Sequence, residues 1–157
     1  MSVIPLAELK AALAPGARLL GLDVGDKTIG LAISDSGLTV ASPIDTIARG
    51  KFAADAARLL KLVDERGVGG LLIGLPVNMD GSEGPRCQSV RQFGRNLLAL
   101  RDLPIAFWDE RLSTAAVERA MIEADLSRQR RARSVDKMAA AYILQGAIDA
   151  IGRAEKA

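Results

Sequence analysis

The chain has 157 residues, the length of one ordinary domain, and a hydrophobic fraction of 49% is enough for a packed core. Charged residues make up 25% and the net charge is only +2, which excludes a disordered chain and makes local charge clusters more informative than the overall balance. The lack of histidine excludes a Ser-His-Asp triad, and the single cysteine, Cys87, excludes an internal disulfide and fits a reducing compartment. No stretch approaches the roughly 18 apolar residues of a membrane span, and the N-terminus lacks the pattern of a signal peptide. We therefore expect a soluble, cytoplasmic protein.

Hydrophobic periodicity predicts both helices and strands along the chain. Short apolar runs bounded by Gly, Pro or Asp indicate buried strands, whereas apolar positions at helical spacing indicate amphipathic helices. The expected helices cover 5–14, 52–66 (closed by Gly67), 87–101, 114–124 (capped by Ser113) and 135–151. The expected strands cover 19–23, 29–34, 39–47 (bulged at Pro43), 71–73 and 104–108, and residues 126–133 are expected to form a polar loop.

The order of these elements predicts the fold class. A short link at Gly25-Asp26 makes the first two strands an antiparallel hairpin, and the third strand continues this arrangement. Helices and strands then alternate, which gives an α/β fold with a five-stranded mixed sheet flanked by helices. Because neither a repeat nor a linker is visible, residues 1–157 are expected to form a single domain, with residues 1–16 as an N-terminal helical extension.

Three acidic residues stand where a lone carboxylate is out of place. Asp23 ends the first apolar strand, Glu110 follows the last one, and Asp136 lies on the apolar stripe of the final helix. Brought together, they would repel one another unless a cation lay between them. Each also has a structural interpretation, as part of a hairpin turn, as part of a helix-start cluster, or as a partner of the helix dipole. Strand alternation places Glu110 on the same face as Trp108 but does not show which face of the sheet meets a site.

Residues near these acids favour binding of a phosphodiester backbone. Lys27 lies in the hairpin turn after Asp23, and a Gly-rich loop over 74–82 follows a strand, the usual place for a ligand in an α/β sheet. A basic run over 128–133 precedes Asp136 and would attract phosphates. Both segments can equally be read as an ordinary connector and a solvated charge run. The candidate nucleic-acid-binding residues are Lys27, Asn78, Ser82, Arg111, Arg130, Arg131, Arg133 and Lys137.

Four motifs, taken in order, resemble the YqgF family, also called RuvX, of RNase H-like nucleases. They are Leu-Asp-Val-Gly-Asp-Lys-Thr-Ile-Gly-Leu-Ala (22–32), Gly-Leu-Pro with the later Gly-Ser (74–82), Asp-Glu-Arg-Leu-Ser-Thr (109–114) and Asp-Lys-Met-Ala-Ala-Ala-Tyr-Ile-Leu-Gln (136–145), within a match over 18–150. The resemblance implies an RNase H-like fold and a bacterial cytoplasmic nuclease that processes the 5′ end of precursor 16S ribosomal RNA. An older assignment within the family is Holliday-junction resolution. One departure is Thr28, where the family commonly has arginine.

The resemblance also implies that Asp23, Glu110 and Asp136 are the catalytic, metal-binding acids. Three carboxylates in a chain without histidine suit Mg²⁺ or Mn²⁺ rather than zinc. We expect a two-metal site for phosphodiester hydrolysis, with ions about 4 Å apart and Asp23 as the bridging ligand. The expected partners are RNA, such as precursor rRNA, or branched DNA, with no membrane, and the protein is expected to be a monomer or homodimer.

Two other classes of function remain open at this point. The first is a non-catalytic nucleic-acid-binding module that has kept the same fold. The second is an actin-like ATPase, whose first phosphate loop also has an Asp-x-Gly hairpin. Such ATPases bind nucleotide between two duplicated domains, whereas this chain has length for only one.

Overall fold

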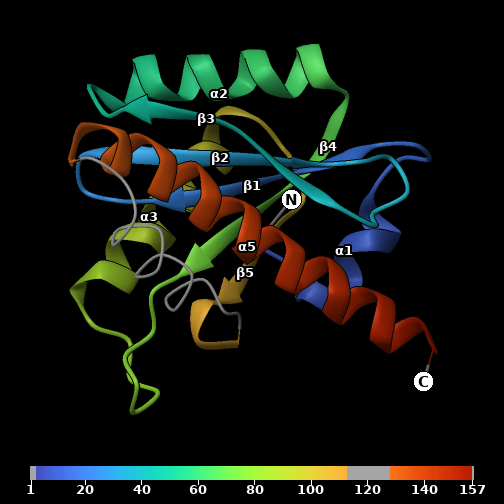
Figure 1. Ribbon diagram of the computed structural model, residues 1–157. Coiled ribbons are helices and arrows are strands. Elements are labelled where there is room, and N and C mark those ends of the chain that lie inside the picture. The colour runs from blue at the N-terminus through green and yellow to red at the C-terminus, as the bar shows by residue number, and fades with distance from the viewer. Residues whose placement is uncertain (1–2, 113–127, 157) are drawn as a thin grey trace.

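The computed structural model describes residues 3–112 and 128–156, with only the helical backbone at 128–136 and at 156. Helices and strands follow one another much as the sequence predicts (Figure 1). The elements are α1 (Leu6–Ala12), β1 (Arg18–Val24), β2 (Thr28–Ser34), β3 (Ala41–Ala48), α2 (Phe52–Arg66), β4 (Val68–Leu75), α3 (Pro85–Leu100), β5 (Ile105–Asp109), the 3-10 helix η1 (Glu110–Leu112) and α5 (Arg128–Lys156). Of the helices described, none combines the length and the apolar character that crossing a bilayer requires.

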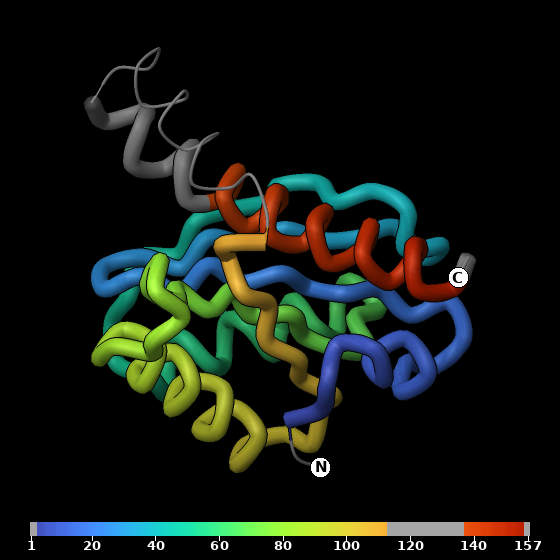
Figure 2. The backbone as a smooth tube through the Cα atoms, turned by 90° about the horizontal axis from the view of Figure 1, so that it is seen from below, coloured from blue at the N-terminus to red at the C-terminus, as the bar shows by residue number. Residues whose placement is uncertain are grey.

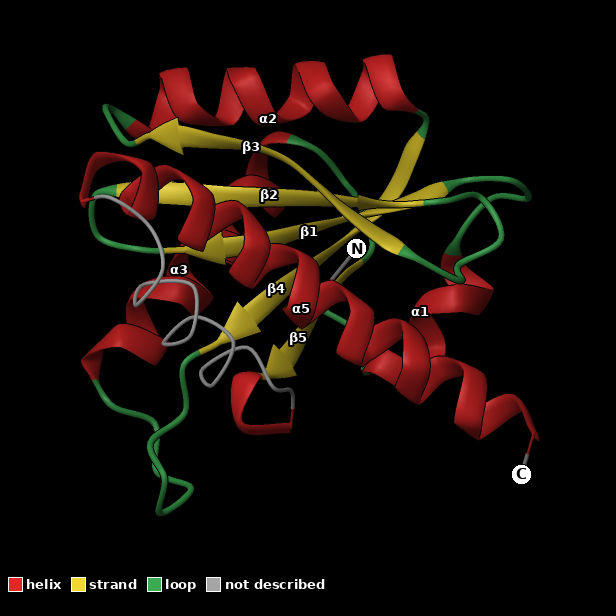
Figure 3. Cartoon of the chain, in the orientation of Figure 1, coloured by secondary structure: helices red, strands yellow, loops and turns green. Residues whose placement is uncertain are grey.

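The strands form one mixed sheet with the order β3-β2-β1-β4-β5 (Figure 3). β1 pairs with β2, and β2 with β3, in antiparallel fashion, whereas β4 runs parallel to both β1 and β5. The carboxyl ends of β1, β4 and β5 therefore meet at one edge of the sheet. The predicted five-stranded mixed sheet is confirmed, and the register of β3 shifts near Pro43, where a bulge was expected.

Side chains alternate between two apolar layers, one on each face of the sheet. Figure 2 shows α5 on one side of the strands and α3 on the other. The first layer, under α2 and α3, contains Leu20, Leu22, Val24, Ile73 and Phe93. The second layer, under α5, contains Leu19, Leu72, Ala106, Trp108, Ala140 and Ile143. Odd-numbered residues of β1 and even-numbered residues of β4 and β5 thus face α5.

Small residues allow α5 to lie close to the sheet. A Cβ atom added at Gly21 of β1 would lie 2.9 Å from Leu144 Cβ and 3.4 Å from the carbonyl oxygen of Ala140. The alanines of α5 are buried against the same face. Because a larger residue at position 21 would collide with the helix, this contact fixes the distance between α5 and β1.

The largest departure from the sequence prediction is at the start of α5. The segment 126–133 was expected to be a polar loop and the last helix to cover 135–151, but α5 begins at Arg128 and ends at Lys156. The loop prediction is therefore wrong for residues 128–133. Arginine, glutamine and alanine are good helix formers, and a run of charge does not by itself end a helix. The helix expected at 114–124, with its cap at Ser113, lies outside the described residues.

The N-terminal extension covers the outer edge of β5. Val3 forms a parallel bridge with Ile105, and the Ile4 amide donates to the Ile105 carbonyl oxygen at 2.9 Å. Leu9 of α1 is fully buried in the layer under α5. An uncovered edge strand is a template for pairing with other chains. The extension therefore protects this edge from intermolecular pairing.

The turn between β2 and β3 provides a pH-dependent contribution to stability. Hydrogen bonds from the Thr39 hydroxyl and from the Val40 and Thr39 amides lower the pKa of Asp35 to about 2. A pKa that is depressed in the folded state stabilises the fold above the unfolded pKa of about 4, and this stabilisation is lost as the pH falls towards 2. We expect Thr39→Val to raise the pKa of Asp35, as measured by NMR titration of the carboxyl group. Ser42→Ala, an exposed change on β3, should leave it unchanged; an unaltered pKa in Thr39→Val would contradict the assignment.

Candidate active site at the carboxyl ends of the strands

Asp23 is the penultimate residue of β1 and lies on the face of the sheet that α5 covers. Leu22 and Val24 on either side of it point into the opposite layer. Leu19 and Gly21, which share its face by alternation, contact the α5 layer. Asp23 is half-buried and pairs through its backbone with Gly30 of β2. A central strand therefore holds this carboxylate at the carboxyl edge of the sheet.

Glu110 begins η1, immediately after β5 ends, and its side chain lies over Gly74 of β4. A Cβ atom added at Gly74 would lie 3.0 Å from Glu110 Oε1 and 2.7 Å from Ile143 Cδ1. The Glu110 carboxylate and the buried side chain of Ile143 thus both lie above Gly74, which has no side chain of its own. Glu110 lies on the Trp108 face of β5, as alternation predicts, and this face is the one under α5.

The sheet register brings Asp23 and Glu110 to either side of Gly74. Leu22 pairs with Ile73, which places Asp23 beside Gly74, and Gly74 pairs with Trp108 on β5. Neighbouring strands lie about 4.8 Å apart, so the backbones of β1 and β5 are separated by roughly 10 Å across this glycine. Two carboxylates that extend over the gap from opposite sides can reach a common cation.

Asp136 lies on α5, one helical turn before Ala140. At the amino end of β3, the Gln145 side chain accepts a hydrogen bond from the Ala41 amide at 2.8 Å, and Ala140 lies over Gly21. The amino-terminal end of α5 therefore lies towards the carboxyl end of β1, where Asp23 is found. The side chain of Asp136 is not among those described. Within the described part of the chain, no three Asp, Glu, His or Cys side chains form a group that could hold a metal ion.

The loop between β4 and α3 projects from the same edge of the sheet and contains a tight turn over residues 78–82 (Figure 1). The Asn78 side chain donates to Ser82 Oγ at 3.1 Å, and Ser82 Oγ donates to Asp80 Oδ1 at 2.6 Å. Gly81 takes φ 89°, a conformation that favours glycine. The Ser82 hydroxyl and amide lower the pKa of Asp80. Asn78 and Ser82, predicted to bind nucleic acid, are therefore exposed groups held in place by each other.

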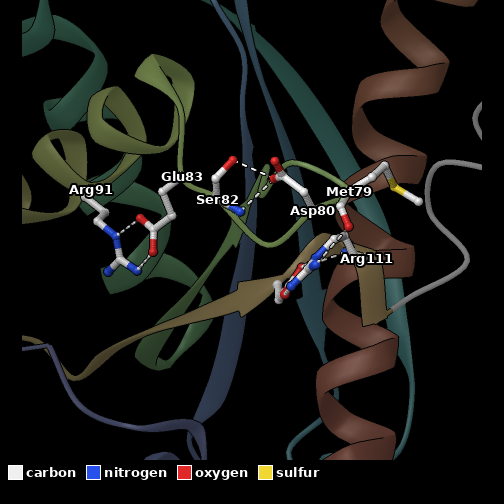
Figure 4. Close-up of polar contacts among 7 residues, drawn as sticks. Met79, Asp80, Ser82, Glu83, Arg91 and Arg111 are labelled. Carbon is white, nitrogen blue, oxygen red and sulfur yellow. Dashed lines mark hydrogen bonds and ion pairs between the residues drawn. The ribbon is translucent and has the colours of Figure 1, made fainter.

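Two arginines attach this loop to the body of the protein (Figure 4). Arg91 of α3 donates to both carboxylate oxygens of Glu83, at 2.6 and 2.8 Å, and its guanidinium lies 5.1 Å from the centre of the Phe107 ring. Arg111 of η1 donates to both oxygens of Asp109 and, at 3.4 Å, to the carbonyl oxygen of Met79. These contacts connect the loop to β5 and α3, and no spacing in the sequence predicts them.

The remaining predicted contact residues lie around the same edge. Lys27 is exposed in the turn between β1 and β2, and Lys137 is half-buried on α5. Arg130, Arg131 and Arg133 lie on the first turns of α5, where only the backbone is described. Cys87 is fully buried at the start of α3, and burial, followed by the negative charge of Glu83, raises the pKa of its thiol, which does not favour a nucleophile.

Arg111 and Arg91 allow a reciprocal test of the two ion pairs, that of Arg111 with Asp109 and that of Arg91 with Glu83. The Arg111 hydrogen bond lowers the pKa of Asp109, and the Arg91 hydrogen bond lowers that of Glu83. We expect Arg111→Gln to raise the pKa of Asp109 towards its ordinary value and to leave Glu83 unchanged, with Arg91→Gln doing the opposite. NMR titration of the carboxyl groups measures both. Equal shifts of both acids in either variant would show that the two ion pairs are not independent.

Comparison with known proteins supports this arrangement of motifs. A family described as "RuvX: Holliday junction resolvase" matches residues 17–150. A protein of Paramagnetospirillum magneticum is 65% identical over 95% of this chain and 96% of its own length, and one of Rhodospirillum rubrum is 60% identical over 98% and 96%. Each carries the name "Putative pre-16S rRNA nuclease".

Among solved structures, Thermus thermophilus RuvC in complex with a Holliday junction substrate matches with a TM-score of 0.53 at 13% identity, covering 85% of this chain and 94% of that one. This likeness confirms the RNase H-like fold that the sequence predicts. With the family match over residues 17–150 and several relatives near 60% identity over almost the full length, the chain belongs to the RuvX family.

Proposed function

We propose that this protein is a metal-dependent nuclease that hydrolyses phosphodiester bonds and processes the 5′ end of precursor 16S rRNA. The observation that carries the proposal is the placement of Asp23 and Glu110 on either side of Gly74, beneath the helix that carries Asp136. The names of the relatives support the choice of precursor rRNA as substrate. Such processing belongs in the cytoplasm, where ribosomes are assembled.

The donor chemistry of the site fits a hard divalent cation. Asp23 and Glu110 offer only oxygen ligands, and the chain has no histidine and one cysteine, which is buried. Mg²⁺ and Mn²⁺ prefer such ligands. In this proposal Asp23, Glu110 and Asp136 hold the metal. Two bound ions would lower the pKa of an attacking water and offset charge on the leaving oxygen. The three carboxylates would hold the ions, and so the attacking water, at the edge of the sheet.

The groups around the acids suit a phosphodiester backbone. We assign Lys27, Lys137, Arg130, Arg131 and Arg133 to phosphate contacts, and Asn78 and Ser82 to hydrogen bonds with the strand being cleaved. Lysine and arginine side chains near the site attract the phosphates of the nucleic acid, and this attraction depends on the salt concentration and not on the base sequence. Arg111 contributes to this surface by holding the loop, because Asp109 and the Met79 carbonyl already engage its guanidinium.

Junction resolution is a second candidate, which the description of the family favours. Cleavage of a four-way junction needs two sites related by a twofold axis, whereas trimming of an RNA end needs only one. A monomeric active species would therefore count against junction resolution, whereas a homodimer is compatible with both functions.

The deciding experiment offers the purified protein precursor 16S rRNA and a four-way DNA junction, side by side, in Mg²⁺ and in Mn²⁺. We expect metal-dependent cleavage near the 5′ end of the rRNA. Cleavage of the junction alone would favour the resolvase. Binding of either substrate without turnover under any divalent ion would instead indicate a non-catalytic binding module.

A further inference from the structure

Arg49 makes a contact with the turn behind Asp23 that neither the motifs nor the family resemblance points to. It follows β3, and its Nη1 atom donates to the carbonyl oxygen of Gly25 at 2.7 Å. Gly25 lies two residues after Asp23, at the point where the chain leaves β1. The guanidinium thus binds the backbone immediately beyond the proposed metal ligand.

Arg49 is itself held from two other directions. Its backbone amide donates to the carbonyl oxygen of Lys27 at 2.8 Å, so Arg49 binds this turn twice. Its guanidinium lies 5.5 Å from the centre of the Phe93 ring, which packs edge-to-face against Phe52. Phe93 is buried in α3. The side chain therefore connects the turn between β1 and β2 to an aromatic pair in the apolar layer opposite α5.

The turn itself is short and contains a backbone hydrogen bond of its own. The Gly25 amide donates to the Thr28 carbonyl oxygen at 2.9 Å, while Asp26 and Lys27 are exposed. Glycine at position 25 gives the backbone more conformational freedom than any other residue would. A hydrogen bond from a charged donor is about twice as strong as one between neutral groups. The bond from Arg49 to Gly25 is therefore well suited to restrain this turn.

We propose that Arg49 is a positioning residue that fixes the turn 25–27, and so holds the Asp23 carboxylate and the Lys27 ammonium in place for the metal and the phosphate. This proposal rests on the proposed nuclease function of the same site. Arg49 acts through the Gly25 and Lys27 carbonyl groups and does not itself touch the substrate. Its loss should therefore affect turnover and metal binding more than the affinity for RNA.

The test compares Arg49→Met, Arg49→Lys and the exposed control Arg58→Met on α2. We expect Arg49→Met to speed hydrogen exchange at the Gly25 amide about tenfold. It should also weaken Mn²⁺ binding, measured by calorimetry without RNA, and lower kcat about tenfold, with KM for RNA changed less than about twofold. Arg49→Lys should recover part of kcat, because an ammonium group can still donate to the Gly25 carbonyl. Arg58→Met should match the wild type in every measurement.

Two results would overturn the proposal. If Gly25 exchange and kcat in Arg49→Met equal those of the wild type, Arg49 does not restrain the turn. If KM rises while kcat and exchange stay constant, Arg49 contacts the phosphate directly. Hydrogen exchange and Mn²⁺ binding need no cleavage, so they test the role of Arg49 even if the wild type proves inactive on RNA, a result that would count against the proposed function alone.

Discussion

Asp23→Asn is expected to abolish metal-dependent cleavage, lowering kcat by at least about 10³-fold. The change keeps the size of the side chain but removes the negative charge of the ligand on the central strand. A metal ion contributes several kcal/mol of transition-state stabilisation, and each 1.36 kcal/mol corresponds to a factor of about ten in rate. Single-turnover cleavage of precursor rRNA in Mg²⁺ measures the loss directly.

The matched control is Asp26→Asn, which removes a carboxylate from the exposed turn only three residues away. It should cleave at close to the wild-type rate. Both variants should retain the fold, with circular dichroism spectra like that of the wild type. Full activity in a folded Asp23→Asn protein would remove Asp23 from the site.

Gly74→Ala is expected to lower kcat by about 10- to 100-fold, because the added methyl group must displace its neighbours. It would lie 2.7 Å from Ile143 Cδ1 and 3.0 Å from Glu110 Oε1. A shift of about 1 Å in a catalytic group can cost about 10²-fold in rate. Overpacking should also lower the free energy of unfolding by about 1–3 kcal/mol, measured by urea denaturation.

A second substitution separates the catalytic effect from the packing effect. Ile143→Val removes the Cδ1 atom, so the double variant Gly74→Ala/Ile143→Val should regain stability while the Glu110 carboxylate remains displaced. Gly152→Ala is the control on α5, where nothing lies within 4 Å of the added methyl group. If activity in the double variant returns together with stability, Gly74 serves packing alone and the placement of Glu110 above it has no catalytic role.

The sequence predicts most of the fold because the strands are apolar runs with clear ends. β4 is the exception, since it begins at Val68 and not at Leu71. Gly69 and Gly70 resemble a loop in the sequence, yet a side chain at either position would collide with Leu13 or Ala17 of the N-terminal segment. This close approach is a tertiary contact, so local propensity cannot show it. The start of α5 at Arg128 also differs from the prediction, because a run of charged residues is typical of a loop but is compatible with a helix.

The candidate site was predictable only in part. Asp23 and Glu110 stand out because Asp23 ends one apolar run and Glu110 follows another, and the parallel pairing of β1, β4 and β5 then brings them to one edge. Their common face, and the role of Gly74 between them, depend on the register and on where α5 packs. The contact between Arg49 and Gly25 joins residues 24 positions apart in the chain. No periodicity in a single sequence encodes such a contact.

Asp23, Glu110 and Asp136 are proposed to form one metal site, and anomalous diffraction tests this proposal most directly. Crystals of the wild type soaked in Mn²⁺, at concentrations that support cleavage, would be measured at the manganese absorption edge. We expect anomalous density between the carboxylates of Asp23 and Glu110, above Gly74, within bonding distance of both and of Asp136. Manganese bound only elsewhere on the protein, or no anomalous density at this edge of the sheet, would contradict the proposal.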